Sequence, residues 1–449
     1  MNYDLVEKYN VPVPRYTSYP TVPLWDSSNI EGARWMSQVL KRFEANNEIS
    51  LYVHLPYCES LCTYCGCNKH ITKNHLVELP YVKTVLKEWE MYRSRFSEKP
   101  IIKELHLGGG TPTFFSPESL DLLINGLLKD AIIPKDRSFS FEAHPSSTSD
   151  VHLETLYNLG FNRLSLGIQD FDEEILKTIH RFQSAEQVER ICRKARELGY
   201  DSINFDLIYG LPKQNNKHID INLDWVKSLK PDRIAFYSYA HVPGVAPGQR
   251  AYSEADLPQG KTKWELYQQG REGFLKMGYQ EIGMDHFALP QDDLARSLKK
   301  HKLHRNFMGY TAQHTDLVIA LGASSISDSW DAFAQNEKTL KEYMRRVREE
   351  EYPPLIKSHY HTAKDEQLRA KLLNLICHFE ADWLNERDYF NEFLLPRFRM
   401  LEADGLLKIF PYQVKVTQRG RSFIRNICAV LDERLNTTEL AKPTFSKAV

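Results

Sequence analysis

Long apolar runs and an excess of one charge are missing from this sequence, and we expect no secretory leader. No stretch of the 449 residues approaches the roughly 18 uninterrupted apolar residues that a membrane helix needs. Lys plus Arg number 58 and Asp plus Glu 59, which gives no long-range attraction to nucleic acid or to an anionic membrane surface. Residues 1–9 include charged side chains and have no apolar h-region of the kind that a signal peptide contains. We therefore expect a cytoplasmic protein without nucleic-acid or membrane partners.

Cysteine is also sparse, but its distribution is uneven. The chain has 7 cysteines, and Cys58, Cys62, Cys65 and Cys67 lie within ten residues of one another. A disulfide framework is typical of small secreted domains, whereas such crowding in a long chain without a signal peptide indicates metal binding in a reducing compartment.

The chain is too long for one ordinary core, so we expect one large domain and a smaller one. From residue 51 onwards apolar runs alternate with helical patterns. The expected strands are Leu51–Leu55, Lys103–Leu107, Ser138–Ala143, Arg163–Ile168, Ser202–Ile208 and Arg233–Tyr239. The expected helices are Leu79–Phe96, Pro117–Leu128, Val151–Leu159, Ala185–Leu198, Ile219–Leu229 and Lys261–Met277. This alternation predicts an α/β fold, an open (βα)6-type barrel with its active site at the C-terminal strand ends.

Two further units flank the predicted barrel, which we place at residues 51–336. Residues 1–50 include four prolines within Val11–Pro23. Proline disfavours a regular helix, so we expect an extended segment that covers the active site and acts on the substrate rather than on the fold; a disordered leader is the alternative. Residues 337–449 carry charged helical patterns and a β-like stretch at Leu407–Val416. They predict a small, mostly helical, winged-helix-like domain.

The crowded cysteines follow the first predicted strand directly. The spacing of Cys58, Cys62 and Cys65 lets one loop hold three irons of a 4Fe-4S cubane, and the fourth iron stays open to a ligand. A four-cysteine zinc site that uses Cys67 as its last ligand is the alternative, although structural zinc sites usually draw cysteine pairs from separated segments.

This loop resembles the signature of the radical S-adenosylmethionine (SAM) superfamily. Together with segments spread along the chain, it resembles the oxygen-independent coproporphyrinogen III oxidase family. Those segments are Pro14–Pro20, Gly108–Thr113, Gly160–Ser165, Asp206–Gln214, Gly283–Ala288, Leu303–Phe307 and Ile424–Cys428. The resemblance implies that Cys58, Cys62 and Cys65 hold a 4Fe-4S cluster that cleaves SAM, whereas Cys67 is not a ligand.

Polar residues at the predicted strand ends suit SAM. Glycines at Gly108–Gly110 allow close backbone approach, Glu142 and Asp206 can accept from a ribose diol, and Arg181 can grip a carboxylate. The resemblance implies two SAM molecules. It assigns to the first SAM or its surroundings Tyr52, Gly109, Glu142, Gln169, Arg181 and Ile326. It assigns to the second Tyr64, Gly110, Thr111, Asp206 and Ala240.

The catalytic candidates are Tyr52, His54, Phe307 and Met308. Tyr52 and His54 share one strand face just before the cysteine loop, although a lone strand histidine is as often a hydrogen-bonded core group. The sequence departs from the family pattern at Met308, where Gln is usual, and at His144, where an acidic residue is usual. Met lacks a strong hydrogen-bond donor, so a polar contact to SAM or substrate is absent there.

The resemblance implies anaerobic oxidative decarboxylation of two propionates of coproporphyrinogen III to vinyl groups, giving protoporphyrinogen IX in haem biosynthesis. A 5′-deoxyadenosyl radical would begin each reaction, with flavodoxin or ferredoxin as electron donor to a monomeric enzyme. Two alternatives remain: a radical SAM enzyme of another tetrapyrrole, such as a haem-degrading methyltransferase, and a haem chaperone on the same barrel. Chaperone relatives have a Phe-like residue at the Cys67 position and lack the Pro14–Pro20 segment, so both features of this chain argue against that class.

Overall fold

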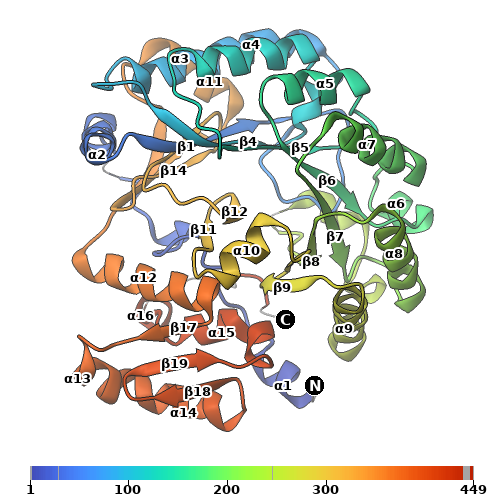
Figure 1. Ribbon diagram of the computed structural model, residues 1–449, viewed down its shortest axis with the longest axis vertical. Helices are drawn as coiled ribbons and strands as arrows, with labels where there is room; N and C mark the ends of the chain where they lie inside the picture. Colours follow the sequence, from blue (N-terminus) through green and yellow to red (C-terminus); the bar gives the residue numbers. More distant parts are fainter. Residues whose placement is uncertain (1–2, 29, 245, 438–444, 448–449) are drawn as a thin grey trace.

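A twelve-stranded mixed sheet forms the centre of the molecule (Figure 1). The computed structural model describes residues 3–28, 30–244, 246–437 and 445–447. The strands that pair in parallel are, in sheet order, β13 (Val318–Leu321), β1 (Glu48–Leu55), β4 (Ile101–Gly109), β5 (Ser138–Ala143), β6 (Arg163–Gln169), β7 (Ser202–Tyr209) and β8 (Arg233–Ser238). The six strands predicted from the sequence are confirmed as β1 and β4–β8.

Helices follow most of these strands and cover the outer face of the curved sheet (Figure 1). They are α3 (Glu78–Arg93), α4 (Pro117–Leu128), α5 (Asp150–Asn158), α6 (Glu173–Thr178), α7 (Ala185–Leu198), α8 (Asn216–Leu229) and α9 (Gly260–Lys276). Helix α7 shows why they form. Ser184 and Gln187 make a capping box, apolar residues at helical spacing are buried, and Gly199 ends the helix with φ 96°.

Short antiparallel strands extend the sheet at both edges, and the sequence analysis missed them. β10 (His286–Ala288) and β9 (Gln280–Gly283) follow β8. On the other side, β14 (Ile326–Asp328), β15 (Ala332–Asn336) and β16 (Leu355–Tyr360) follow β13. Because β16 joins this sheet, the sheet continues past residue 336, where we placed the end of the barrel.

The first fifty residues differ from the expected extended segment. Helices α1 (Tyr3–Tyr9) and α2 (Gly32–Ala45) lie within them, and β1 starts at Glu48. The proline-rich part between the helices has no α-helix, as expected, but its apolar side chains belong to the core: Tyr16 and Tyr19 are buried. The expectation that this segment is separate from the fold is therefore wrong, because aromatic side chains hidden among the prolines pack inward.

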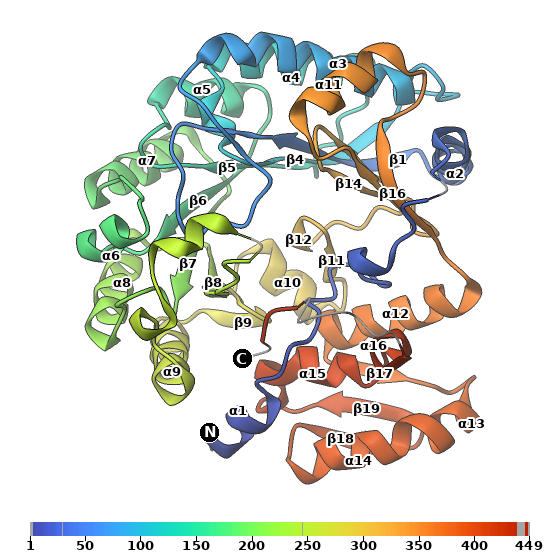
Figure 2. The same cartoon turned by 180° about the vertical axis from the view of Figure 1, so that it is seen from behind.

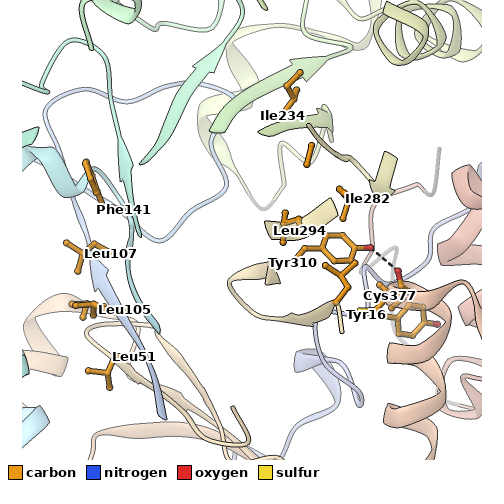
Figure 3. Packing of buried hydrophobic residues seen from close by; sticks show 14 of the residues in the cluster. Tyr16, Leu51, Leu105, Leu107, Phe141, Ile234, Ile282, Leu294, Tyr310 and Cys377 are labelled. Atoms are coloured by element: carbon orange, nitrogen blue, oxygen red, sulfur yellow. Dashed lines mark hydrogen bonds between the residues drawn. The ribbon is translucent and has the colours of Figure 1, made fainter. Parts of the chain in front are cut away.

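The C-terminal part forms a second layer below the sheet (Figure 1). It contains α12 (Ala363–His378), α14 (Leu395–Ala403), α15 (Ile424–Ala429) and a three-stranded antiparallel sheet of β17 (Glu380–Asp382), β19 (Gln413–Val416) and β18 (Leu407–Phe410). The β-like stretch predicted at Leu407–Val416 is the β18–β19 hairpin. One hydrophobic cluster runs from strand residues such as Leu51 and Phe141 to Tyr16, Tyr310 and Cys377, the last of which lies on α12 (Figure 3).

The two ends of the chain meet at this second layer. Pro12 and Lys447 form an isolated antiparallel bridge, and the Val13 N–H donates to the Ser446 carbonyl over 3.3 Å. Figure 2 shows the N-terminal segment running beside the last part of the chain. Among the described residues, no helix is both long and apolar enough to cross a membrane.

Candidate active site

A cavity of about 520 Å³ lies at the C-terminal ends of the parallel strands. Its wall brings together side chains that the sequence analysis selected from separate parts of the chain. These are Cys58, Cys62, Tyr64, Cys65, Gly109, Gly110, Thr111, Glu142, Gln169, Arg181 and Asp206. Cys67, His144 and Arg15 also line it. The predicted meeting of strand-end residues at one edge of the sheet is thus present in the structure.

The cysteine loop is closed at its base by two short strands. β2 (Tyr57–Cys58) pairs in parallel with β3 (His70–Ile71), and the Thr111 hydroxyl donates to Cys58 Sγ over 3.2 Å. A hydrogen bond from the Cys67 thiol, helped by Lys69, lowers the pKa of Cys65 to about 6 although burial opposes it. No three Cys, His, Asp or Glu side chains in the described part of the chain converge on the position of one metal ion. The thiols line the wall of a larger space instead.

The glycine loop after β4 lies directly against the cysteine loop. Gly109 has φ 111°, and a Cβ there would come within 2.5 Å of the His54 ring. A Cβ on Gly110 would lie 2.6 Å from the backbone of Pro56. The Thr111 N–H donates to the Tyr57 carbonyl over 2.9 Å. Only glycine permits this close approach, which fixes one loop against the other.

Glu142 is an ionised acceptor at the end of β5. The Gly109 N–H donates to its Oε2 over 3.2 Å, and His106 Nε2 lies 3.7 Å from its Oε1. Burial alone would raise the pKa of Glu142, but His106 and the Gly109 N–H outweigh burial and hold that pKa below its usual value. The carboxylate therefore accepts hydrogen bonds in its charged form.

Asp206 on β7 is the second carboxylate of the cavity, and its environment differs. Ser165 Oγ and Asn204 Nδ2 donate to its two oxygens over 2.9 and 3.0 Å. Burial, together with the negative charge of Glu142, nevertheless raises the pKa of Asp206 to about 7. Near neutral pH, Glu142 is therefore ionised, whereas Asp206 can gain or lose a proton.

Arg181 places a positive charge beside the cysteine loop. Its guanidinium donates to the Gly167 carbonyl and to Gln183 Oε1 (2.8 Å), and Nη1 lies 3.5 Å from Cys62 Sγ. Burial, together with the charge of Arg181, lowers the pKa of His144 well below its usual value. The histidine that departs from the family pattern is thus neutral.

Both the sequence and the fold are similar to those of known proteins. The profile of the Radical SAM superfamily matches residues 52–226. Oxygen-independent coproporphyrinogen III oxidase of Pseudomonas aeruginosa is 38% identical, with 99% of this chain and 98% of the relative covered. Its counterpart in Escherichia coli is 37% identical over 96% of this chain and 95% of the relative. The chain belongs to the oxygen-independent coproporphyrinogen III oxidase family.

The fold agrees with that membership. A solved structure of coproporphyrinogen III oxidase from Escherichia coli, described as a radical SAM enzyme, matches with a TM-score of 0.87 at 34% identity, covering 96% of this chain and 99% of that one. Membership implies a 4Fe-4S cluster and SAM as cofactors. The donor set fits them: three thiols of one loop, an ionised acceptor, a guanidinium and a glycine-lined wall border the same space.

Several candidates that the family resemblance suggested lie outside this cavity. Tyr52 and His54 are behind the glycine loop, where the Tyr52 hydroxyl and His54 Nδ1 are 3.2 Å apart and His54 Nε2 lies 2.8 Å from the Asn68 carbonyl. The two side chains therefore support the loops that form the cavity wall. Ile326 is the first residue of β14, and neither Ile326 nor Ala240 lines the cavity.

Phe307 and Met308 separate in space although they are adjacent in sequence. The Phe307 ring packs edge-on against Trp25 and Phe333, with ring centroids 6.0 and 5.6 Å apart, and does not line the cavity. Met308 faces a smaller inner cavity of about 130 Å³ that shares Glu142 with the larger one.

Two contacts at this site were not predicted from the sequence. His106 helps to keep Glu142 ionised. It lies on the same strand as the glycine loop, two residues before it, and this position could have identified His106 as a site residue. Gln249 donates from Nε2 to the carbonyls of Tyr64 and Ala240, each over 3.1 Å. Nothing in the local sequence of Gln249 indicates this bridge, because it depends on how a long loop folds back.

Proposed function

We propose that the protein decarboxylates two propionates of coproporphyrinogen III to vinyl groups without oxygen and so makes protoporphyrinogen IX for haem biosynthesis. One observation carries the proposal: the cysteine loop, Glu142, Arg181 and Arg15 line a single cavity at the strand ends. The relatives reported above match nearly the whole chain and are named as oxidases. This supports the oxidase over a haem-degrading methyltransferase or a haem chaperone.

The cofactors would be held by residues of the parallel strands and their loops. Cys58, Cys62 and Cys65 bind the cluster as thiolates. Glu142 accepts from the ribose hydroxyls of SAM, and Arg181 pairs with its carboxylate. When bound, the cluster and SAM would supply a 5′-deoxyadenosyl radical able to take one hydrogen atom from a propionate, and loss of CO2 with transfer of one further electron to an acceptor would leave the vinyl group. Gly109 and Gly110 let this part of the wall lie directly against His54 and Pro56, which fixes the shape of the cavity beside the proposed cofactors.

We further propose a second SAM molecule in the same cavity. Tyr64, Gly110, Thr111 and Asp206 line that cavity. Asp206 can hold or release a proton near neutral pH, which distinguishes it from the ionised Glu142. Ala240 would contribute from the adjoining loop, to which Gln249 ties the Tyr64 backbone. Counting SAM molecules per protein by equilibrium dialysis tests this: two are expected, and one would contradict it.

The electron donor would be a small redox protein such as flavodoxin or ferredoxin, bound at the outer side of the cysteine loop. Phe182 is 55% exposed, and its ring lies 4.8 Å from that of His180, which contacts the Leu61 carbonyl. The next residue inward, Arg181, reaches Cys62 Sγ. This surface is therefore a short route from outside to the cluster ligands.

Phe182→Ala tests this surface because a small chemical reductant needs no docking. We expect weaker flavodoxin binding by calorimetry and slower flavodoxin-driven cluster reduction, with dithionite-driven reduction unchanged. Phe393→Ala is the matched control, since Phe393 is also 55% exposed but lies in the C-terminal layer. Equal behaviour of the two variants would contradict the proposed surface.

We also propose that the protein works as a monomer in the cytoplasm, without nucleic-acid or membrane partners. The near balance of 58 basic and 59 acidic side chains supports the absence of nucleic-acid and membrane partners, because it favours no polyanionic partner. Residues 1–50, 51–336 and 337–449 remain our proposed division of the chain, although the first range packs Tyr16 and Tyr19 into the common core and the barrel sheet reaches into the third through β16.

The proposed function is tested by an anaerobic assay with coproporphyrinogen III, SAM and a reductant. Mass spectrometry should find protoporphyrinogen IX, detected as protoporphyrin after oxidation. Tight haem binding without turnover would favour the chaperone instead, and methylated or ring-opened haem would favour the methyltransferase.

A further inference from the structure

A second cavity, of about 420 Å³, adjoins the cysteine cavity. Arg15 lines both cavities. Hydrogen bonds from Gln249 to the Tyr64 and Ala240 carbonyls link the two loops that lie between the cavities. Of the residues proposed to bind cofactors, only Ala240 borders this second cavity. It is therefore close to the cofactors and largely separate from them.

The wall of the second cavity is strongly cationic. Arg15, Lys263, Arg425 and Lys447 line it, and Glu254 is the acidic side chain among the described lining residues. Asp285 reaches Arg15 from the neighbouring region, with Oδ2 3.0 Å from Arg15 Nη2. The four cations thus exceed the carboxylates near them, which favours an anionic ligand.

Two of these cations have clearly different roles. The Arg425 guanidinium donates to the carbonyls of Pro14 (3.2 Å) and Lys447 (2.9 Å), so it holds the two ends of the chain together. Lys263 on α9 donates from Nζ to the Tyr239 carbonyl over 2.8 Å. Among the described residues, no ion pair within 4.0 Å involves Lys263.

The environment of Lys263 is short of negative charge. Burial, together with the positive charge of Lys447, lowers the pKa of Lys263 to about 8; Asp285 opposes this shift, whereas Arg15 and Arg425 add to it. A partly buried ammonium with one backbone acceptor retains further N–H groups that can donate. A carboxylate in the cavity would supply the missing charge and accept from them.

We propose that this cavity binds a substrate propionate other than the reacting one, with Lys263 as the residue that recognises its carboxylate. The inference rests on the proposed function, because a macrocycle with four propionates has carboxylates left over when one lies at the cofactors. Arg15, which borders both cavities, would then lie between the propionate that reacts and the propionate that Lys263 binds. Lys263 is then a specificity residue for substrates that carry a non-reacting propionate.

The test compares porphyrins that differ in carboxylate number. Anaerobic holoenzyme is titrated with coproporphyrin III, which has four free propionates, and with its tetramethyl ester, which has none, and binding is followed by porphyrin fluorescence. Lys263→Met should weaken coproporphyrin binding about tenfold, the worth of a charge-assisted hydrogen bond, with a much smaller effect on binding of the ester. In turnover, KM for coproporphyrinogen should rise more than kcat falls, and Lys263→Arg should restore most of the affinity.

Lys261→Met is the matched control. Lys261 lies on the same helix, pairs with Glu265 over 3.8 Å and does not line the cavity, so its loss should leave both affinities unchanged. Equal losses for the two porphyrins in Lys263→Met, or wild-type binding of both, would overturn the carboxylate site. A wild-type protein that binds coproporphyrin but does not convert coproporphyrinogen would instead overturn the proposed function, so the two failures are distinguishable.

Discussion

The parallel part of the sheet and the regions that flank it play different roles. Strands β1 and β4–β8 are long and carry the cavity with the cysteine loop and both carboxylates. The flanking regions, which are the two chain ends, the edge strands β9, β10 and β14–β16, and the C-terminal layer, contribute part of the wall of the second cavity and much of the packing around the substrate side. Changes in the first region should therefore affect the cofactors while the fold survives. Changes in the second should affect the fold or the substrate.

The largest effect in the parallel region is expected for Cys62→Ser. A serine hydroxyl does not replace a thiolate at iron, so the cluster absorption and SAM cleavage should be lost while the melting temperature of the apoprotein stays the same. Cys67→Ser is the control and should keep the cluster. Full iron loading of Cys62→Ser, or cluster loss in Cys67→Ser, would contradict the assignment of the three ligands.

The largest effect in the flanking region is expected from deleting residues 1–22. Tyr16 and Tyr19 are buried, the Tyr16 hydroxyl contacts Asp432 Oδ2 over 3.2 Å, and the Arg425 guanidinium donates to the Pro14 carbonyl. Removing a buried aromatic side chain costs about 3–5 kcal/mol, and the cost of removing two approaches the unfolding free energy of a typical domain. We expect the truncated protein to be insoluble or, where it is soluble, to lack the near-UV circular dichroism signal of fixed aromatic side chains. A truncated protein with wild-type melting would restore the sequence-based interpretation of a separate covering segment.

Arg369→Met should produce an intermediate effect in the same region. The Arg369 guanidinium on α12 contacts both carboxylate oxygens of Asp328 on β14, and both side chains are 7% exposed. Loss of the arginine leaves a buried carboxylate unpaired, at a cost of about 3–5 kcal/mol in unfolding free energy. Denaturant unfolding measures this cost. The double variant Arg369→Met, Asp328→Leu should recover stability, and failure to recover would mean that packing rather than charge is at fault.

Glu142→Gln should have the smallest effect and should act on SAM alone. The amide keeps the shape but removes the charge that His106 and the Gly109 N–H stabilise, so SAM binding should weaken by about 1.5–3 kcal/mol. Calorimetry with the reconstituted protein gives the affinity, and iron content serves as the control. Unchanged affinity would remove Glu142 from the SAM site.

Sequence analysis succeeded where residues repeat a clear period or spacing. Strands β4–β8 are apolar runs flanked by helical patterns, and the loop Cys58–Cys65 has ligand spacing, so both could be recognised locally. Strands such as β14 and β10 have three residues each, too few to show a period. The buried aromatic residues Tyr16 and Tyr19 were obscured by the prolines around them, because burial depends on partners that are hundreds of residues away.

The candidate site shows the same division. Residues at strand ends, such as Glu142 and Asp206, could be predicted to meet because parallel strands share one edge. The bridge by Gln249 and the position of Lys263 could not, because they depend on how α9 and a long loop are placed after folding.

The central claim is that one cavity directs a SAM-derived radical at a propionate of coproporphyrinogen III. The most direct measurement uses substrate deuterated at the propionate β-carbons, incubated anaerobically with the reconstituted enzyme, SAM and dithionite. The account predicts deuterium in the 5′-deoxyadenosine that is released, together with vinyl product. Vinyl product without deuterium in 5′-deoxyadenosine, or SAM cleavage with no decarboxylation, would contradict it.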